Sequence, residues 1–289
     1  MKIAITGSGG YIGTNIIEKL DQRNFQMSRI DRELLYGDYQ SFAEKLKGTD
    51  AIINLAGAPV IQRWTRKNRS VIYNSRVQTT QNLVKAINAI KHTYRPRVVV
   101  SISAIGIYRD ELVHDETSTR YANHFAARVI DNWEDALVEL PEDIRRIIFR
   151  SGIVIGKNSP FMNRLLPVFK LGIGGKIGDG KQAFPFIHID DVAQAFEAAI
   201  SENSYSGIYN LVAPEQISNQ EFTKIFAKKL NRPAFFHVPA IALRALYGKA
   251  ANLIIKSPVV IPQRLKKQNF KFIYPSIEGS LKEILNKKN

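Results

Sequence analysis

The sequence contains no cysteine among its 289 residues. A chain without thiols forms no disulfide framework, no cysteine nucleophile and no zinc site built on thiolates. It also has no uninterrupted apolar run near the ~20 residues that a membrane-spanning helix needs. Its first residues enter a strand-like stretch without the charged and apolar leader of a secreted protein. We therefore expect a cytoplasmic protein with no membrane association.

Acidic residues are scarce in the last quarter of the chain. Residues 222–289 contain 14 Lys and Arg but only two acids, so they carry +12 of the formal net charge of +15. Such a surface binds nucleic-acid phosphates, lines a cleft for anionic substrates, or consists only of solvated lysines. Phe270, Phe272 and Tyr274 alternate as on a strand face, and such a strand packs into a core more often than it binds bases. We therefore expect a small-molecule substrate, with an anion left open, rather than a nucleic acid; the oligomeric state is undetermined.

Short apolar runs alternate with helical patterns through the first 150 residues. The runs cover residues 3–5, 51–55, 98–100 and 147–149, and the helical patterns cover 11–20, 66–90 and 124–140. Strands that are apolar on both faces are typical of a parallel sheet covered by helices on each side. The pattern predicts an α/β fold with a Rossmann-type doubly wound parallel sheet.

The character of the chain changes after about residue 155. Glycines crowd into residues 172–180, and prolines break the region after Ser218 into short helices. Ser218 and Glu221 form the pattern of a capping box, which predicts a helix over 219–230. We expect residues 1–155 plus about 183–212 to form the NAD(P)-binding domain. Residues of about 156–182 plus 213–289 then form a small, basic, mostly helical C-terminal lobe.

Three glycines follow the first strand-like run at the spacing of a dinucleotide-binding loop. The segment TGSGGYIG leads directly into the first helical pattern. Gly7 permits a tight turn, Gly10 lets the backbone approach a pyrophosphate, and Gly13 allows close packing of helix and sheet. The helix N-terminus offers unpaired N–H groups to phosphates. The three glycines, with Tyr11 and Ile12 between them, are therefore candidate cofactor residues; a plain glycine-rich turn is the alternative.

The second strand-like run ends at Asp31 and Arg32, 18 residues after the last glycine. An acid at this position hydrogen-bonds the ribose hydroxyls of NAD and repels the 2′-phosphate of NADP, whereas an arginine attracts that phosphate. The pair leaves NAD and NADP both open, with a lean to NAD from Asp31. A solvated loop charge is the alternative for Arg32.

Several further stretches carry a more specific pattern across the whole chain: residues 54–59, 63–65, 75–76, 133–134, 150–156, 165–180, 187–191 and 262–264. Together with the glycine loop they resemble the extended short-chain dehydrogenase/reductase superfamily, and within it the atypical NAD-dependent epimerase/dehydratase or nucleoside-diphosphate-sugar epimerase subgroup. The resemblance implies a cofactor cleft with Leu55 and Ala56 after the fourth strand, and with Arg76 and Arg150 near the cofactor. A surface salt bridge is the alternative for Arg76.

The resemblance also defines where catalytic residues belong. Members of the superfamily use a Ser or Thr after the fifth strand and a Tyr-x-x-x-Lys pair on the next helix, in which the Tyr is the general acid/base. Ser103 matches the first position, but Phe125 and Val129 stand where Tyr and Lys belong. Tyr108 lies on the following loop and could reach the cleft, although no lysine pairs with it. Ser103 and Tyr108 are therefore our candidate catalytic contacts.

A second departure concerns the substrate. In nucleotide-sugar members an arginine that binds the diphosphate follows a stretch like residues 178–182, and here Phe184 takes its place. The resemblance implies that His188 and Asp190 brace and cap a helix; action of the His188 imidazole on a substrate is the alternative. No His, Asp or Glu cluster has metal-ligand spacing, so we expect no metal site. We expect an NAD(P)-binding oxidoreductase or epimerase-like protein acting on a small carbonyl or sugar-like substrate. The alternative is a non-catalytic module that senses the dinucleotide or binds a partner.

Overall fold

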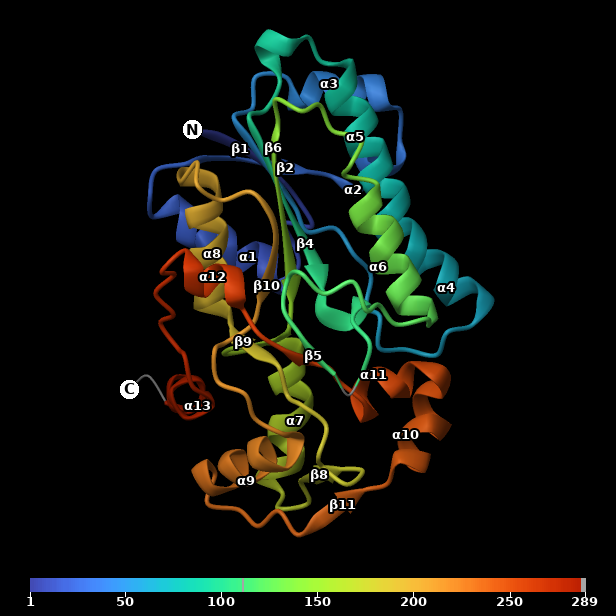
Figure 1. Cartoon of the computed structure of the whole chain (residues 1–289), viewed down its shortest axis with the longest axis vertical. Coiled ribbons are helices and arrows are strands. Elements are labelled where there is room, and N and C mark those ends of the chain that lie inside the picture. Colours follow the sequence, from blue (N-terminus) through green and yellow to red (C-terminus); the bar gives the residue numbers. More distant parts are fainter. Residues whose placement is uncertain (111, 287–289) are drawn as a thin grey trace.

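The computed structural model describes residues 1–110 and 112–286. At its centre is a sheet of six parallel strands in the order β10-β6-β4-β3-β1-β2 (Figure 1). The strands are β1 (Lys2–Thr6), β2 (Gln26–Ile30), β3 (Ala51–Asn54), β4 (Val98–Ala104), β6 (Arg145–Ser151) and β10 (Gly207–Leu211). The direction in which the sheet grows reverses between β1 and β3, and doubly wound sheets bind ligands at such a point. The predicted Rossmann-type doubly wound parallel sheet is confirmed.

Helices cover both faces of this sheet (Figure 1). One face carries α1 (Tyr11–Asp21), α8 (Ile189–Ser201) and α12 (Gln263–Lys267); the other carries α2 (Arg32–Tyr36), α3 (Tyr39–Leu46), α4 (Arg66–Tyr73), α5 (Thr79–Ala89) and α6 (Phe125–Asp135). Ile3 and Ile5 pack into the core under α1 and α8, while Ala4 between them packs into the core under α3 and α5. Because successive residues of a strand face opposite layers, a strand buried on both faces needs an uninterrupted apolar run.

The segment between β2 and β3 differs from the prediction. The strand that ends at Asn54 was expected to be the fourth, and it is the third strand of the chain. The 20 residues between Ile30 and Ala51 contain α2 and α3 rather than an edge strand with its crossover. Asp38 begins α3, since its carboxylate accepts a hydrogen bond from the backbone N–H of Ser41 at 2.8 Å. The sheet therefore ends at β2, and Asp31 lies at this open edge.

A second group of elements lies beyond the carboxyl ends of the strands, and part of it packs around its own core. It comprises α7 (Pro160–Lys170), β8 (Gly175–Ile177), α9 (Asn219–Lys229), β11 (Phe236–Val238), α10 (Ala240–Tyr247), η4 (Gly248–Ala251), α11 (Asn252–Ile255) and α13 (Ile277–Leu285). The predicted capping box is confirmed, because Ser218 and Glu221 exchange hydrogen bonds at the start of α9. The division of the chain into two domains stays a prediction.

Short elements connect the two groups: β7 (Ile153–Ile155) pairs with β9 (Phe186–His188), and β5 (Val113–His114) pairs with β12 (Val259–Val260). The turns η2 (His92–Tyr94) and η3 (Ile105–Ile107) flank β4. As expected, His188 begins α8, and its Nδ1 accepts from the N–H of Asp190 at 3.3 Å. None of the described helices is long and apolar enough to cross a membrane.

The strand expected at Phe270, Phe272 and Tyr274 is absent, and that prediction was wrong. The three rings are half-buried in alternation with exposed residues, but the backbone has no partner strand. The Asp191 carboxylate accepts hydrogen bonds from the N–H groups of Ile273 and Tyr274 at 2.5 and 3.1 Å. A side chain thus satisfies the backbone donors that a neighbouring strand would otherwise satisfy.

Candidate functional site

The glycine loop lies between the ends of β1 and β3. Gly7 has φ +66°, and a Cβ there would lie 2.7 Å from the Leu55 carbonyl oxygen; one at Gly13 would lie 2.5 Å from the Gly7 oxygen. Thr6 Oγ1 accepts from the N–H groups of Leu55 and Ala56 at 3.0 and 3.2 Å, which joins the ends of the two strands. Side chains at Gly7 or Gly13 would therefore push the loop off the sheet. The loop leaves its backbone exposed at the start of α1.

Two cavities lie along this loop. The larger, which we call the Asp31 cavity, measures about 480 Å³ and is lined by Gly7, Asp31, Arg32, Ala56 and neighbouring residues. The Arg32 guanidinium lies 5.6 Å from the centre of the Tyr36 ring on the same wall. Asp31 and Arg32 are both exposed, so both can contact a ligand in this cavity.

The second, which we call the Tyr11 cavity, measures about 340 Å³. Its lining includes Gly7, Gly10, Tyr11, Ile12, Gly13 and Leu55, together with Ile102 of β4, Ile153 and Phe161. It shares Gly7 and Gly57 with the Asp31 cavity, so the two form one cleft over the loop. Burial raises the pKa of Tyr11, whose hydroxyl donates to the Lys157 carbonyl at 3.1 Å, so this phenol is a neutral wall of the cavity at neutral pH.

Arg76 lies on η1 (Asn74–Gln78), a π-helical turn between α4 and α5, and is not on the lining of the Asp31 or Tyr11 cavity. Its Nη1 donates to the Ala58 carbonyl at 2.8 Å, and its guanidinium lies beside Gly57. Burial lowers the pKa of Arg76 to about 10, which leaves it protonated at neutral pH. No carboxylate lies within 4 Å of this cation among the residues that the structure describes. π-helical turns occur frequently at functional sites, and this one places a cation beside Gly57, which lines both cavities of the cleft.

Arg150 lies on β6, in a buried hydrogen-bond network with side chains of β4 and α6. Only 1% of its side chain is exposed, and its Nη2 lies 2.6 Å from a carboxylate oxygen of Glu134 on α6. Burial lowers the pKa of Arg150, but the hydrogen bonds and charge of Glu134 more than offset this and raise it above its ordinary value. Arg150 is not on the lining of the Asp31 or Tyr11 cavity, and a contact with the cofactor stays a prediction.

Ser103 and Tyr108 belong to the same network. The Ser103 hydroxyl donates to Glu134 at 2.5 Å, and the Tyr108 hydroxyl donates to Asn210 Oδ1 at 2.8 Å while accepting from Arg150 at 2.9 Å. Their exposed fractions are 4% and 1%. Burial raises the pKa of Tyr108, which disfavours its use as a base. Both hydroxyls therefore have protein partners, and their role as catalytic contacts stays a prediction.

Replacement of Ser103 separates these two roles. If its hydroxyl serves only Glu134, Ser103→Ala lowers the free energy of unfolding by about 1 kcal/mol, the net value of one hydrogen bond, and leaves NADH affinity unchanged. Urea denaturation and fluorescence titration measure the two effects. A more than tenfold loss of NADH affinity at unchanged stability would instead place Ser103 in contact with the ligand.

A third cavity, the inner cavity, measures about 230 Å³ and lies next to the Tyr11 cavity, with which it shares Ile153. Most of its lining is apolar, including Ile72, Val129, Ile130 and Leu253. The charged or titratable residues on its wall are Arg76, Asp110, His124 and Lys256. Val129, expected at the position of the lysine, is therefore part of an apolar wall of this cavity.

His124 is the side chain that our sequence reasoning missed. It begins α6, directly before Phe125, and its Nδ1 accepts from the N–H of Ala127 at 3.0 Å. An Nδ1 that accepts leaves the proton of a neutral imidazole on Nε2. Burial lowers the pKa of His124, although the charge of Asp110 opposes this. The sequence does place His124 directly before Phe125, the residue that aligns with the tyrosine of the superfamily, and this position could have identified it.

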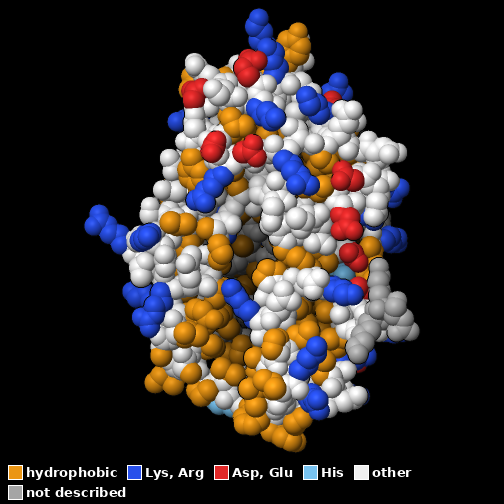
Figure 2. Space-filling view, turned by 180° about the vertical axis from the view of Figure 1, so that it is seen from behind, with side chains coloured by type: hydrophobic (Ala, Val, Ile, Leu, Met, Phe, Trp, Pro, Cys, Tyr) orange, Lys and Arg blue, Asp and Glu red, His pale blue; other side chains and the backbone are white. Residues whose placement is uncertain are grey.

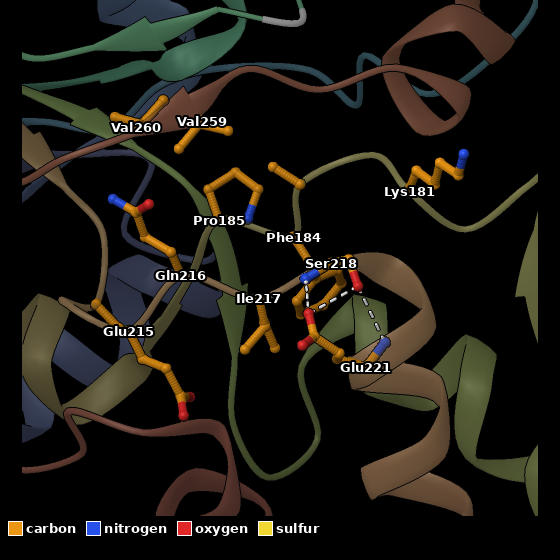
Figure 3. Close-up of a pocket in the computed structure, with 12 residues that line it drawn as sticks. Lys181, Phe184, Pro185, Glu215, Gln216, Ile217, Ser218, Glu221, Val259 and Val260 are labelled. Atoms are coloured by element: carbon orange, nitrogen blue, oxygen red, sulfur yellow. Dashed lines mark hydrogen bonds between the residues drawn. The ribbon is translucent and has the colours of Figure 1, made fainter.

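Figure 3 shows a separate cavity of about 210 Å³ around Phe184, which we call the Phe184 cavity. Phe184 stacks on Phe222 with ring centres 4.1 Å apart and is 4% exposed. Lys181 is the single cation on its lining, opposite two carboxylates, Glu215 and Glu221. Such a wall is poorly suited to a diphosphate, because two acids outnumber one cation.

The loop after β3 contacts the C-terminal elements over the cleft. Arg63 donates from Nε to the Leu246 carbonyl at 3.1 Å and from Nη2 to the Ala245 carbonyl. A guanidinium at the C-terminal end of α10 also complements the helix dipole. These bonds join the loop to the C-terminal end of α10, and Figure 2 shows the hollow between the two parts of the molecule. Among the described residues, no group of three or more His, Asp or Glu could hold a metal ion.

The doubly wound sheet, the glycine loop and the cleft above it define an NAD(P)-binding protein of the short-chain dehydrogenase/reductase type. A model of the NAD dependent epimerase/dehydratase family matches residues 3–211, and a model of a domain of unknown function (DUF1731) matches residues 238–284. The chain belongs to the NAD-dependent epimerase/dehydratase family.

Its relatives resemble it over nearly the whole chain. The human epimerase family protein SDR39U1 is 32% identical over 295 residues, which cover 99% of this chain and 100% of the human protein. The crystal structure of human SDR39U1 (isoform 2) with NADPH has a TM-score of 0.91 at 31% identity and covers 98% of this chain and 99% of that one. A nucleoside-diphosphate sugar epimerase from Corynebacterium glutamicum has a TM-score of 0.79 at 25% identity, covering 99% of this chain and 58% of the other.

Proposed function

We propose that this protein is an NAD(P)-dependent oxidoreductase that reduces a small carbonyl compound or oxidises the corresponding alcohol. The observation that carries the proposal is that the glycine-loop cleft and the mostly apolar inner cavity lie next to each other, with Ile153 on the lining of both. The residues fit a dinucleotide, because a Cβ at Gly7 or Gly13 would collide with the backbone that forms the cradle. A nicotinamide dinucleotide bound there would supply or accept a hydride.

We assign binding of the cofactor to both cavities of the cleft. Gly7, Gly10, Tyr11, Ile12, Gly13, Leu55 and Ala56 would surround its phosphates and nicotinamide half, and Asp31 and Arg32 would contact the adenosine ribose. Arg76 would contact a phosphate or ribose from the inner side, because it is a protonated cation without a carboxylate partner among the described residues. In this assignment the sheet domain holds the cofactor and the basic C-terminal lobe covers the substrate.

His124 takes the place of the missing tyrosine in our proposal. Its Nε2–H would donate a hydrogen bond to the substrate carbonyl oxygen and stabilise the negative charge that develops there during hydride transfer. A neutral imidazole can polarise a carbonyl in this way, and the bond from Ala127 to Nδ1 keeps the required tautomer. The proton that completes the alcohol then comes from solvent. Arg150, Ser103 and Tyr108 support the wall from behind in this scheme.

Asp31 and Arg32 oppose each other in the choice of cofactor. Asp31→Ala is expected to raise the NADPH:NADH affinity ratio about tenfold, because it removes the repulsion of the 2′-phosphate, and Arg32→Ala is expected to lower that ratio. The NADPH in the human relative is a reason to expect measurable NADPH binding beside the lean to NAD. Titration by nicotinamide fluorescence measures both affinities. Ratios that do not move in either variant would exclude these residues from the ribose contact.

Turnover tests the proposal as a whole. The purified protein with NADPH or NADH is incubated with small aldehydes and ketones, and loss of absorbance at the reduced nicotinamide band is recorded. We expect oxidation of the cofactor and a large loss of kcat in His124→Gln with unchanged cofactor affinity. Cofactor binding without turnover of any carbonyl would favour the non-catalytic alternative, and absence of cofactor binding would reject both.

A further inference from the structure

An outer cavity of about 310 Å³ lies beside the inner cavity at the surface of the molecule. Its lining combines the aromatic rings of Trp64 and Phe125 with three cations, Arg69, Arg128 and Lys249. Asn123, His124, Asn252 and Leu253 complete the wall. The cations come from α4, α6 and η4, elements that are far apart in the sequence and converge only in the fold.

The charge of this cavity is unbalanced. Its lining contains no carboxylate, and none of the three cations has an ion pair within 4 Å among the residues that the structure describes. Two of them are held in place by neutral groups: the Arg69 guanidinium lies 4.6 Å from the centre of the Phe125 ring, and Arg128 donates to Asn123 Oδ1 at 3.1 Å. Cations that converge on a concave surface attract an anion.

The outer and inner cavities meet at His124 and Leu253, which line both. The inner cavity is mostly apolar and, at about 230 Å³, is smaller than the ~300–1,000 Å³ of sites for drug-sized ligands. One ligand can therefore place a small apolar body in the inner cavity and a charged group in the outer one. His124 lies between these two halves.

We propose that the substrate is a small anionic carbonyl compound. Its apolar, carbonyl-bearing part occupies the inner cavity, and its carboxylate or phosphate binds Arg69, Arg128 and Lys249 in the outer cavity. The carbonyl oxygen then lies at His124, on the path between the two cavities. This assignment names the substrate class of the proposed oxidoreductase and rests on that proposed function.

The same observations disfavour a nucleotide sugar. Phe184 stands where an arginine would bind the diphosphate, and the Phe184 cavity presents two carboxylates against one lysine. The three cations of the outer cavity lie on different elements from Phe184, and they suit one terminal anionic group.

Three matched probes test whether the substrate is a small anionic carbonyl compound. They are 3-benzoylpropionate, its neutral methyl ester and phenacyl phosphate, all aromatic ketones of similar size, and their affinities are measured by calorimetry with and without saturating NADPH. We expect each anion to bind at least about tenfold more tightly than the ester, since charge-assisted bonds to two or three cations are made by the anions alone. The difference is expected to shrink at high salt. The stronger anion identifies whether phosphate or carboxylate is the preferred end group.

Variants locate the anion site. Arg128→Gln combined with Lys249→Gln is expected to lower the affinity for both anions about tenfold or more, with the affinities for the ester and NADPH unchanged. The matched control is Lys228→Gln combined with Lys229→Gln, which removes the same charge from exposed positions on α9 and is expected to change nothing.

Each outcome decides a separate point. Equal affinity of ester and anions, no binding of any probe, or equal effects of the two double variants would overturn the substrate class. Anion-selective binding that the outer-cavity variant abolishes, without oxidation of NADPH, would keep the ligand class and reject the oxidoreductase. If NADPH itself does not bind, the probe affinities measured without it still decide the anion site.

Discussion

Gly10→Asp is expected to lower the affinities for NADH and NADPH by about 100-fold or more. Gly10 precedes the first residue of α1 and lines the Tyr11 cavity, where the helix N-terminus is free to bind phosphate. A carboxylate there takes up the same N–H groups and repels the pyrophosphate. Fluorescence titration of the two reduced cofactors measures the loss.

The same substitution is expected to leave the fold intact. Gly10 is the N-cap of α1 and no side chain caps this helix, so an aspartate at that position is expected to keep or raise the free energy of unfolding. A Cβ at Gly10 would lie 3.3 Å from the Gly7 carbonyl oxygen, a tight but tolerable contact. Gly10→Ala is the matched control, with the Cβ but no charge, and should lose far less affinity. Retention of NADH binding by Gly10→Asp would contradict the assignment of the loop.

Glu134→Ala is expected to lower the free energy of unfolding by about 3–5 kcal/mol. The variant removes the partner of a guanidinium that is 1% exposed and leaves its charge inside the protein. It also removes the acceptor of the Ser103 hydroxyl. Urea denaturation measures the change, and Glu139→Ala, at an exposed position after α6, is the control that should change stability by less than about 0.5 kcal/mol.

The variant Glu134→Ala also tests whether Arg150 contacts the cofactor. If Arg150 acts only in the buried network, the folded fraction of Glu134→Ala binds NADH as the unaltered protein does. A stability loss below about 1 kcal/mol would mean that the ion pair is solvated, contrary to its burial.

The glycine loop and most of the sheet could be predicted from local sequence. The inner strands of the sheet contain short apolar runs, and the loop needs glycine where a Cβ would meet backbone within 2.7 Å. The absence of an edge strand between β2 and β3 could not be predicted from the family resemblance. The 20 residues between these two strands have room for α2 and α3 alone. The family resemblance therefore predicted that the strand ending at Asn54 is the fourth, whereas it is the third.

The cofactor role of the candidate site residues stays a prediction. The cofactor residues of the loop, together with Asp31, Arg32, Leu55 and Ala56, do line one cleft. Ser103 and Arg150 match family positions, and Tyr108 lies on the loop after the strand of Ser103. Ser103 and Arg150 bond to Glu134, and Tyr108 bonds to Arg150 and Asn210, rather than lining the cleft. Sequence position fixes the strand on which a residue lies, but the partner of a side chain depends on which elements pack behind that strand.

The sequence by itself determined the parallel sheet, the glycine loop and the excess charge of residues 222–289, because each of these depends on neighbouring residues or on composition. Only the tertiary structure decided which cations lie together, and two of the three on the outer cavity, Arg69 and Arg128, come from outside residues 222–289. Arg69, Arg128 and Lys249 converge on one cavity although 121 residues separate the last two, and His124 reaches both cavities because it begins α6. Convergence of this kind follows from the packing of the lobe over the sheet, which no local pattern encodes.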